Sequence, residues 1–457
     1  MEKINEGVFK AYDLRGIYST EIDEDFAYKL GRAYATFVLE KNPESKNIVL
    51  SSDMRLSSPS LRKEVERGLL DSGVNVVDIG LSSTPTFYFA VAYYGYDAGI
   101  QVSASHNPKS YNGFKMVLQA GYPVSKNTGI IRIKDIMISG SFVESQAKGI
   151  IYKEENVLED LASEQLANID IGKIKKFKIV IDASSAMGSL DMDEFFKYVP
   201  ADVIRLNFDL DGSFPSHEAD PMKDENVELL KKEVVDNKAD FGISIDGDAD
   251  RYFFIDEKGE RLDQNILHAI MAKIALKTNP EAPVCYDVRS GKTCSDIIES
   301  MKGEGILTPV GHSLIKEIML ENDAYYGGES SGHYYFKEHY GTFEMPFLLM
   351  AKFMQFLSSE EKTFSEMVGP YKKYFSSGEI NREVEDQKAA LERVKEKYKD
   401  GKILEVDGIS VEYPDYWFNV RTSNTEPLVR LNLESKSPEL TEERVEEVLR
   451  VIEGVIG

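Results

Sequence analysis

Between two apolar runs, residues 103–115 of this 457-residue chain read SASHNPKSYNGFK. The run 99–102 before this stretch predicts a buried strand, and 114–118 after it resumes an extended apolar pattern. Pro108 cannot continue a strand ladder, and Asn112-Gly113 is a turn dipeptide. We therefore expect Ser105 and His106 to lie on an exposed loop that joins two strands.

The residue types in this loop favour phosphate chemistry. A serine beside a histidine and small residues can accept a phosphoryl group, because free backbone N–H groups and a nearby cation offset the added negative charge. The alternative interpretation is an ordinary polar turn, since Ser, Asn and Pro dominate loops of every kind. Ser105 and His106 are thus candidate catalytic residues.

Length, charge and cysteine usage exclude several classes of protein. The length predicts about three or four domains, and 42% hydrophobic residues suffice for globular cores. A formal net charge of −24 argues against nucleic acid or an anionic membrane as partner. The sequence shows neither a membrane-spanning run nor a signal peptide. Cys285 and Cys294 form no disulfide framework or CxxC motif, which favours the reducing cytoplasm.

Alternating strand and helix patterns recur three times, and a different pattern follows from about residue 363. The sequence therefore predicts three mixed α/β domains and a smaller α+β domain with a mostly antiparallel sheet. We expect its last helix to be capped by Thr441 and to end at Gly454. The predicted strands are 47–50, 74–79, 99–102, 114–118, 178–182, 201–205, 241–245, 252–255, 283–287, 305–308, 324–326, 409–413, 416–420 and 428–433.

Three aspartates alternate directly after the predicted strand 241–245. Asp246, Asp248 and Asp250 can converge on one hard cation, and ligation by oxygen alone suits Mg²⁺ far better than zinc. An EF-hand calcium loop is the alternative, with Glu257 at its twelfth position. That motif requires a glycine where Arg251 stands and helices where strands are predicted, so we favour the magnesium loop.

Two further loops carry polar groups suited to a phosphorylated sugar. Residues 327–333 read GGESSGH, and Glu329 and Ser331 can hold adjacent sugar hydroxyls from one side of an extended segment. Residues 421–427 read RTSNTEP, in which one guanidinium, small polar side chains and backbone N–H groups can cradle a phosphate. A glycine-rich turn and a capping segment are the respective alternatives.

These stretches, in this order, resemble the motifs of the phosphohexomutases, the phosphomannomutase/phosphoglucomutase family. The resemblance covers nearly the whole chain and implies three similar mixed α/β domains plus a smaller C-terminal α+β domain around a central cleft. The domains it implies are 1–151 with the phosphoserine loop, 152–255 with the metal-binding loop, 256–366 with the sugar-binding loop and 367–457 with the phosphate-binding loop.

The resemblance implies a mutase that interconverts hexose 1-phosphate and hexose 6-phosphate, of mannose, glucose or both. It implies a phosphoserine at Ser105, a hexose 1,6-bisphosphate that is both intermediate and activator, and one Mg²⁺ held by Ser105, Asp246, Asp248 and Asp250. The catalytic residues it implies are Ser105, His106, Lys115, Arg251, His333 and Arg15, with the general base open among Lys115, Arg251 and His333. The substrate-binding residues it implies are Tyr12, Arg289, His312, Glu329, Ser331, Arg421, Ser423, Asn424 and Thr425.

Two other functions stay open at this point. A phosphoglucosamine mutase is the first, although its members tend to carry glycine where Asn424 stands, and Glu344, where many relatives carry aspartate, leaves the preferred hexose undecided. A non-catalytic sugar-phosphate sensor is the second, and the phosphorylatable Ser105 beside a metal loop argues against it. The expected partners are small hexose phosphates, and the sequence leaves monomer or dimer open.

Overall fold

The computed structural model of the chain describes residues 4–422 and 428–454. It divides into two compact units, which are described separately. Unit 1 contains the residues up to Leu262 together with Gly332–Ser365, and unit 2 contains Asp263–Ser331 and the residues from Glu366 onward. Of the helices in this described part of the chain, none has the length and hydropathy that crossing a bilayer requires.

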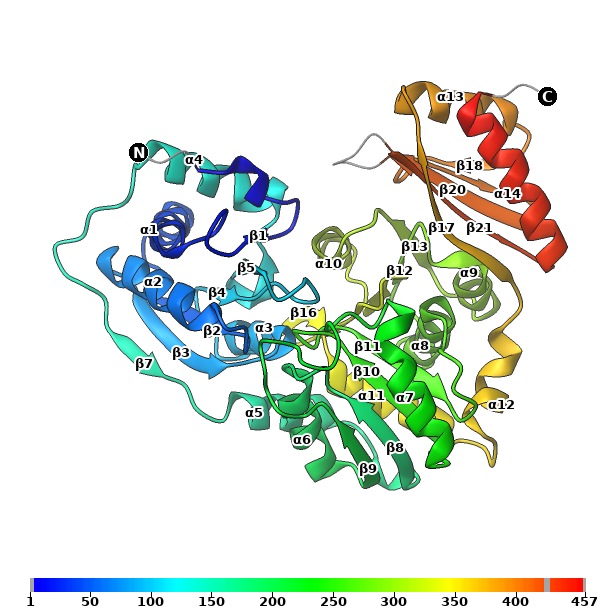
Figure 1. Cartoon of the computed structure of the whole chain (residues 1–457), viewed down its shortest axis with the longest axis horizontal. Coiled ribbons are helices and arrows are strands. Elements are labelled where there is room, and N and C mark those ends of the chain that lie inside the picture. The colour runs from blue at the N-terminus through cyan, green and yellow to red at the C-terminus, as the bar shows by residue number, and fades with distance from the viewer. Residues whose placement is uncertain (1–3, 423–427, 455–457) are drawn as a thin grey trace. The chain divides into compact units, whose positions relative to one another are not determined.

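The first sheet of unit 1 has the strand order β1-β5-β4-β2-β3-β7, with β6 paired to β5 (Figure 1). The four consecutive strands β4, β2, β3 and β7 run parallel, whereas β1 and β6 lie antiparallel to β5, which is antiparallel to β4. Its strands are β1 (Leu14–Ile17), β2 (Asn47–Ser52), β3 (Asn75–Leu81), β4 (Ala98–Val102), β5 (Tyr111–Leu118), β6 (Tyr122–Pro123) and β7 (Ile151–Lys153).

Helices cover both faces of this sheet. The side chain of Asp23 caps α1 by accepting from the N–H of Phe26, and one core joins α1, α2 and α4 to β2, β4 and β5. On the other face α3 packs closely on β4, because a Cβ at Gly99 would meet Phe87 and Val91. The helical segments are η1 (Glu6–Val8), α1 (Glu24–Lys41), α2 (Ser58–Asp71), α3 (Thr84–Tyr93), η2 (Gln119–Gly121), η3 (Lys126–Ile130) and α4 (Ile131–Ser139).

The second sheet of unit 1 has the order β11-β10-β8-β9, and only β11 is antiparallel to its neighbour. A Cβ at Gly188 would meet Ile245, and one at Gly242 would meet Val234, so α6 and α7 pack on this sheet. The elements are α5 (Val157–Leu166), η4 (Ile171–Lys173), β8 (Phe177–Asp182), α6 (Gly188–Tyr198), β9 (Ala201–Leu206), α7 (Asp224–Asp236), β10 (Phe241–Ile245) and β11 (Tyr252–Asp256).

A later segment of the chain returns to complete unit 1. β15 (Tyr334–Glu338) and β16 (Gly341–Glu344) form an antiparallel hairpin, followed by α11 (Pro346–Leu357) and α12 (Phe364–Val368), of which α11 belongs wholly to this unit. On α11, Phe353 lies 4.7 Å from Phe254 between ring centroids, and Phe347 lies 5.4 Å from Phe195. The helix therefore belongs to the core of the second sheet.

Three tyrosines at the C-terminal end of α3 and just beyond it hydrogen bond to carboxylates in α5 or shortly before it. Each phenol O–H group donates to one carboxylate, so the end of α3 is joined to the segment that leads into the second sheet. This tyrosine ladder consists of Tyr93 with Glu164, Tyr94 with Asp160 and Tyr96 with Glu154.

In unit 2, β12 pairs in parallel with β13 on one side and with β14 on the other. Helices pack closely on these strands, because a Cβ at Gly327 would meet Met319 and one at Gly305 would meet Ile298. The elements are α8 (Gln264–Thr278), β12 (Val284–Asp287), α9 (Gly291–Ser300), β13 (Gly305–Thr308), α10 (His312–Glu321) and β14 (Tyr326–Gly328).

The last sheet is antiparallel throughout, in the order β17-β21-β20-β19-β18, and α13 and α14 share its core. The predicted cap of α14 is wrong: Ser437 caps the helix by accepting from the N–H of Leu440, and Pro438 is its first residue. Thr441 instead donates to the carbonyl of Phe375. The elements are η5 (Gly369–Tyr371), β17 (Phe375–Glu383), α13 (Gln387–Lys397), β18 (Lys402–Leu404), β19 (Ile409–Glu412), β20 (Tyr416–Thr422), β21 (Leu428–Ser435) and α14 (Pro438–Glu453).

The predicted α/β and α+β patterns are confirmed, with one turn misplaced. Asn112-Gly113 lies inside β5, where Gly113 pairs with Arg15 of β1. A Cβ at Gly113 would lie 2.3 Å from the carbonyl oxygen of Leu14, so close packing between strands explains the glycine. The helix end predicted at Gly454 is confirmed, with φ at +74°.

Candidate functional site

The serine loop connects β4 to β5 in unit 1, as predicted, but its first residues, 103–105, are buried. Ser105 is 3% exposed, and its backbone has a φ of +50°, a left-handed conformation that a serine rarely adopts. The hydroxyl of Ser103 accepts a hydrogen bond from the N–H of Ser105 at 3.1 Å. The predicted exposure is wrong for Ser105, which other parts of unit 1 cover, whereas His106 is half-buried and Lys109 and Ser110 are exposed.

Arg55 is one of these covering residues, and the sequence analysis did not single it out. Its guanidinium is 1% exposed and donates to four main-chain carbonyls of the serine loop. The acceptors are the carbonyls of Ser105 at 2.6 Å, Asn107 at 2.6 Å, Pro108 at 2.9 Å and Tyr111 at 3.1 Å. Arg55 therefore fixes the backbone conformation of this loop.

The metal loop lies directly against the serine loop. Asp246, at the end of β10, accepts from the hydroxyl of Ser105, with Oδ2 3.2 Å from Oγ. A Cβ at Gly247 would lie 2.3 Å from the carbonyl oxygen of Ser105, so only glycine permits this approach. Ala249, in the same loop, also has a left-handed φ of +58°. Each of the two loops thus contains one residue in a strained backbone conformation.

Three carboxylates and two cations form a buried network around this contact. Asp246, Asp248 and Asp250 are all buried, and each lies within an ion pair. Nζ of Lys115 lies 2.6 Å from Oδ2 of Asp248 and 2.8 Å from Oδ2 of Asp250. Nη2 of Arg251 lies 2.8 Å from Oδ2 of Asp246. When all three aspartates are ionised, these five groups carry one net negative charge.

The neighbouring charges and burial shift the pKa values of these groups. Burial, together with the charges of Asp250 and Asp248, raises the pKa of Asp246 to about 7 against the opposing charge of Arg251. Burial disfavours the charged form of Lys115, yet Asp248 and Asp250 hold its pKa well above the usual value. Lys115 is therefore a firmly protonated cation in this arrangement.

His106 contacts the serine itself. Its Nδ1 lies 3.1 Å from Oγ of Ser105. The charge of Arg251, with burial and the charge of Arg15, lowers the pKa of His106 well below its usual value. A neutral imidazole beside a hydroxyl can accept or return a proton.

The aspartate cluster has the donor set that a divalent cation requires. Ligand oxygens of Asp246, Asp248 and Asp250 all lie within 4.8 Å of one another. Oδ1 of Asp248 is buried and has no hydrogen-bond partner among the described residues, which is costly for a carboxylate unless a cation satisfies it. The EF-hand alternative is wrong, because β10 and β11 flank the loop and Glu257 binds Ser365 instead.

Arg15, on β1, reaches the same loop. Its Nη1 donates to the carbonyl of Ala104 at 3.2 Å and also to the side chain of Asn107, while Asp13 holds its Nε at 2.7 Å. Tyr12 lies half-buried in the turn before β1. The structure thus brings Arg15 to the serine loop.

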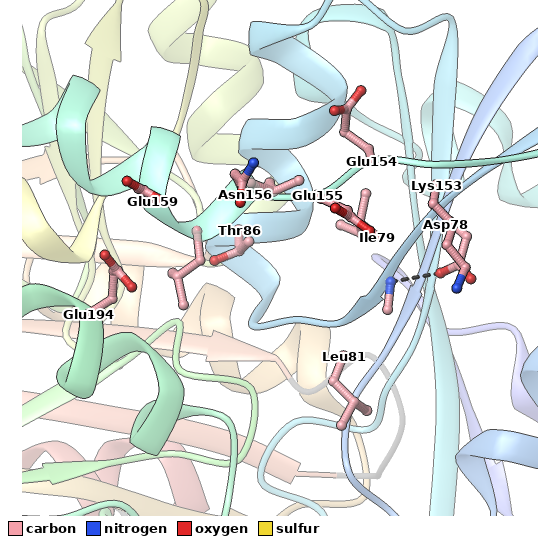
Figure 2. A pocket seen from close by; sticks show the side chains of 13 residues that line it. Asp78, Ile79, Leu81, Thr86, Lys153, Glu154, Glu155, Asn156, Glu159 and Glu194 are labelled. Atoms are coloured by element: carbon pink, nitrogen blue, oxygen red, sulfur yellow. Dashed lines mark hydrogen bonds between the residues drawn. The ribbon is translucent and has the colours of Figure 1, made fainter.

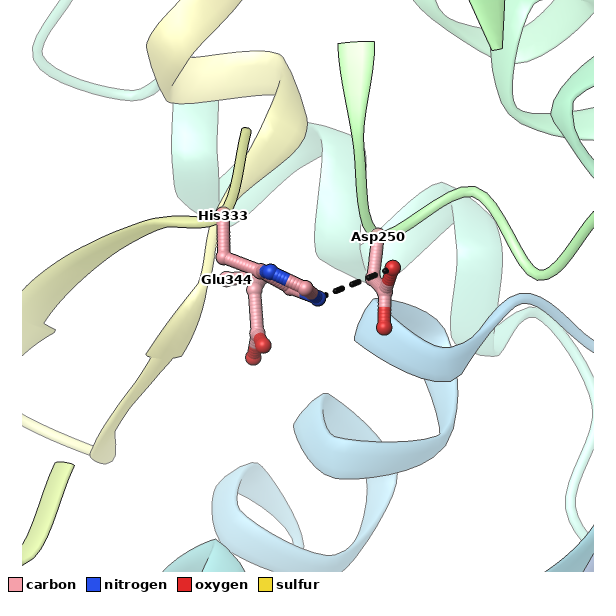
Figure 3. A group of neighbouring side chains, drawn as sticks. All are labelled: Asp250, His333 and Glu344. Carbon is pink, nitrogen blue, oxygen red and sulfur yellow. Dashed lines mark ion pairs between the residues drawn. The ribbon is translucent and has the colours of Figure 1, made fainter. Parts of the chain in front are cut away.

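His333 joins the cluster from the segment just before β15. Its Nε2 lies 3.4 Å from Oδ1 of Asp250, and Figure 3 shows both side chains with Glu344 of β16. Ligand atoms of these three residues also lie within 4.8 Å of one another. All six predicted catalytic residues, Ser105, His106, Lys115, Arg251, His333 and Arg15, therefore belong to unit 1.

The predicted sugar-binding residues of unit 2 gather around the end of β12. Arg289 binds Asp287 through its Nε at 2.9 Å, and its Nη2 lies 3.7 Å from Oε1 of Glu329. Oε1 of Glu329 also accepts from the N–H of Gly311 at 2.9 Å. His312 begins α10 directly after Gly311. Ser331, two residues beyond Glu329, is half-buried.

Arg421 is the part of the predicted phosphate loop that the structure describes. It lies on β20, is 6% exposed and forms an ion pair with Glu379. Arg430 shares this partner, with Nη1 3.4 Å from Oε1 of Glu379. Burial lowers the pKa of Arg421, although the charge of Glu379 opposes the shift. The predicted Ser423, Asn424 and Thr425 lie outside the described residues.

One pocket of unit 1, with a volume of about 440 Å³, contains none of these residues (Figure 2). It lies beside the end of β3 and the start of α5, and carboxylates dominate its lining. Such a surface repels a phosphorylated sugar. The acidic residues of the lining are Asp78, Glu154, Glu155, Glu159 and Glu194.

Comparison with known proteins decides the family. Models of the phosphoglucomutase/phosphomannomutase family match four successive segments: alpha/beta/alpha domain I at residues 6–144, domain II at 158–259, domain III at 263–374 and the C-terminal domain at 379–451. The chain belongs to this family. Its architecture is therefore three α/β/α domains followed by a C-terminal domain.

Individual relatives agree over the full length. A phosphomannomutase of Methanocaldococcus jannaschii is 38% identical over 450 residues, covering 97% of each chain. One of Vibrio cholerae serotype O1 is 35% identical over 456 residues, covering 97% of this chain and 98% of the relative. The solved structure of a family protein from Burkholderia thailandensis has a TM-score of 0.90 at 28% identity, covering 98% of each chain.

Family membership establishes the class of reaction. The chain is a phosphohexomutase, an isomerase of the phosphomannomutase/phosphoglucomutase type. The family and the acidic cluster of unit 1 together indicate a bound metal ion.

Proposed function

We propose that the enzyme interconverts the 1- and 6-phosphates of mannose, glucose or both by passing a phosphoryl group through Ser105. The observation that carries this proposal is the 3.2 Å contact between Oγ of Ser105 and Oδ2 of Asp246, inside a buried group of carboxylates and cations. Phospho-Ser105 gives its phosphoryl group to the free hydroxyl of a hexose monophosphate. The resulting hexose 1,6-bisphosphate then returns its other phosphoryl group to the serine.

Asp246, Asp248 and Asp250, with an oxygen on Ser105, are the proposed ligands of one Mg²⁺. When bound, the ion supplies positive charge to the oxygens of the transferring phosphoryl group. The buried Oδ1 of Asp248 and the net negative charge of the network support this assignment. A phosphoserine brings about two negative charges, which a divalent ion balances.

The remaining residues of unit 1 have proposed roles around the moving proton and charge. Lys115, Arg251 and His333 are the candidates for handling the proton of the reacting hydroxyl. The firmly protonated Lys115 suits the return of a proton and not its removal. Arg15 steadies the serine loop and presents its guanidinium to phosphate oxygens, and His106 exchanges a proton with the serine oxygen. The contacts of Arg15 with the loop support its part.

For unit 2 we propose binding roles. Glu329 and Ser331 hold two sugar hydroxyls, and Arg421, Ser423, Asn424 and Thr425 hold the phosphate that is not transferred. Arg289 and His312 of unit 2, together with Tyr12 of unit 1, complete the proposed set of substrate-binding residues. The resemblance of these stretches to the family's motifs supports the assignments. The proposed domains are 1–151, 152–255, 256–366 and 367–457.

The cytoplasm is the proposed location. Cys285 and Cys294 are both buried and unpaired. Free thiols are typical of reducing compartments, which supports this placement.

A coupled assay tests the proposed reaction on mannose 1-phosphate, glucose 1-phosphate and glucosamine 1-phosphate, with Mg²⁺ and a trace of hexose 1,6-bisphosphate. We expect turnover of one or both of the first two sugars, and a loss of at least about 1,000-fold in Ser105→Ala. Intact mass spectrometry should find one phosphoryl group on the wild type and none on the variant. Faster turnover of glucosamine 1-phosphate would favour the phosphoglucosamine alternative, and binding without turnover would indicate a sensor.

A further inference from the structure

The first residue of α3 holds the central carboxylate of the metal loop at two points. The hydroxyl of Thr84 donates to Oδ2 of Asp248 at 2.5 Å, and the N–H of Thr84 donates to the main-chain carbonyl of Asp248 at 2.9 Å. Both residues are completely buried. They are separated by 164 positions in the sequence. The contact therefore fixes both the backbone and the side chain of Asp248.

The two oxygens of Asp248 have different surroundings as a result. Oδ2 accepts from Thr84 and lies 2.6 Å from Nζ of Lys115, so its hydrogen-bonding capacity is largely used. Oδ1 is buried, and within residues 4–422 and 428–454 it has no hydrogen-bond partner. Thr84 thus determines which oxygen of the carboxylate stays available.

A second acceptor competes for the hydroxyl proton of Thr84. Oε1 of Gln101, on β4, lies 2.7 Å from Oγ1 of Thr84, while Nε2 of Gln101 donates to the carbonyl of Ser82 at 3.0 Å. Thr84 has one hydroxyl proton and two oxygen acceptors within reach. The charged carboxylate is the stronger acceptor, so the proton belongs with Asp248.

A helix cap also holds the start of α3. Ser83 caps the helix, with Oγ accepting from the N–H of Thr86 at 3.3 Å. The hydroxyl of Ser83 also donates to Oγ1 of Thr86 at 2.9 Å. This cap stabilises the first turn of α3, so Thr84 has little freedom to move.

We propose that Thr84 is a positioning residue for metal binding: its hydroxyl orients Asp248 so that Oδ1 is presented to the divalent cation. The inference rests on the proposed metal site and adds to it a residue of the first sheet layer. It assigns to Thr84 no contact with the metal or with the sugar. Orienting groups behind a ligand typically change metal affinity by about 10–100-fold when removed.

The test measures Mn²⁺ binding to the full chain by electron paramagnetic resonance, in which the signal of the free ion falls on binding. Thr84→Val removes the hydroxyl and keeps the β-branched shape, whereas Thr84→Ser keeps the hydroxyl. Thr86→Val is the matched control, because Thr86 is also buried in the first turn of α3 but binds Ser83 instead. Circular dichroism and the melting temperature establish that each variant is folded.

We expect Thr84→Val to lose about 10–100-fold in Mn²⁺ affinity, and Thr84→Ser and Thr86→Val to keep the wild-type affinity. The Mg²⁺ concentration for half-maximal activity should rise by the same factor in Thr84→Val. Thr84→Ala provides a second folded variant without the hydroxyl, should valine disturb the helix.

Wild-type affinity in either folded variant that lacks the hydroxyl would overturn the role of Thr84 and leave the metal site intact. A loss of equal size in Thr84→Ser would also overturn it, because the shape of the side chain and not the hydroxyl would then matter. Failure of the wild type to bind Mn²⁺ would instead refute the proposed metal site itself.

Discussion

Nη2 of Arg55 donates to the carbonyl oxygen of Ser105 over 2.6 Å, so a buried cation holds the backbone of the proposed phosphoserine. Three more carbonyls of the same loop accept from this guanidinium. A lysine has one nitrogen and cannot reach four acceptors in a fixed plane. The position of the serine therefore depends on an arginine at residue 55.

Arg55→Lys should reduce kcat/KM by about 100-fold, because a displacement of the reacting group by about an ångström has an effect of that order. Steady-state kinetics on glucose 1-phosphate and mannose 1-phosphate measure the loss. Arg62→Lys is the control, since Arg62 pairs with Asp78 and does not contact the serine loop. Wild-type kcat/KM in Arg55→Lys would show that the loop holds its shape without the guanidinium.

Gly247→Ala should separate the metal loop from the serine loop. The added Cβ would lie 2.3 Å from the carbonyl oxygen of Ser105, so one of the loops must shift. We expect kcat/KM to fall by at least about 100-fold while the melting temperature changes by only a few degrees. Gly369→Ala is the comparison, because a Cβ there meets nothing within 4 Å. Equal activity of the two variants would contradict the steric argument.

Asp191→Asn should remove a pH dependence of stability. Burial raises the pKa of Asp191 from 3.8 to about 7, although Ser83 opposes the shift. The folded state then binds the proton more tightly than the unfolded chain does. The contribution of Asp191 to the free energy of unfolding therefore declines as pH rises from about 4 to about 7. The decline amounts to at most about 4 kcal/mol.

Thermal melts at several pH values check this prediction. The melting temperature of the wild type should fall relative to that of Asp191→Asn between about pH 4 and pH 7. Asp193→Asn, an exposed position on the same helix, should leave the wild-type slope unchanged. Parallel curves for the wild type and Asp191→Asn would mean that Asp191 is ionised in the folded protein.

His217 should remain protonated above its ordinary pKa of 6.5. Both ring nitrogens face acceptors, with Nε2 2.9 Å from Oδ2 of Asp182 and Nδ1 2.9 Å from the carbonyl oxygen of Glu218. Burial alone would lower the pKa of His217, but the hydrogen bond and charge of Asp182 raise it. Its stabilising contribution is complete below pH 6.5 and is lost as pH rises through the raised pKa.

Nuclear magnetic resonance of labelled histidine rings measures this pKa directly, with His217→Gln to assign the signal among the six histidines of the chain. Asp182→Asn should lower the pKa of His217, because it removes the negative partner. A pKa of His217 below 6.5 in the wild type would contradict the predicted ion pair.

The sequence was sufficient to predict the α/β and α+β patterns, because each strand or helix has an apolar pattern within its own few residues. Asp246, Asp248 and Asp250 were equally accessible to sequence reasoning, since they follow a strand that can be recognised from five residues. Ser437-Pro438 carried the signal for the start of α14, which the choice of Thr441 overlooked.

Other features of the fold and the site could not be predicted from the neighbouring residues in the sequence. Thr84 and Arg55 act on partners 164 and about 50 positions away, so their roles appear only when the layers are assembled. Asn112-Gly113 has the composition of a turn, but contact with the neighbouring strand outweighs this preference. The burial of Ser105 likewise follows from Arg55 and Gly247, which no pattern within residues 103–115 reveals.

The tyrosine ladder has a consequence for the energetics of catalysis. The ladder binds the C-terminal end of α3 to the segment around α5, and Thr84 binds the N-terminal end to Asp248. Both ends of the helix next to the metal loop are therefore fixed. Dipoles and charges braced in this way need little reorientation when a phosphoryl group changes partner. An incoming sugar phosphate meets an electrostatic environment that folding has already arranged, and the reorganisation energy of the transfer is correspondingly small.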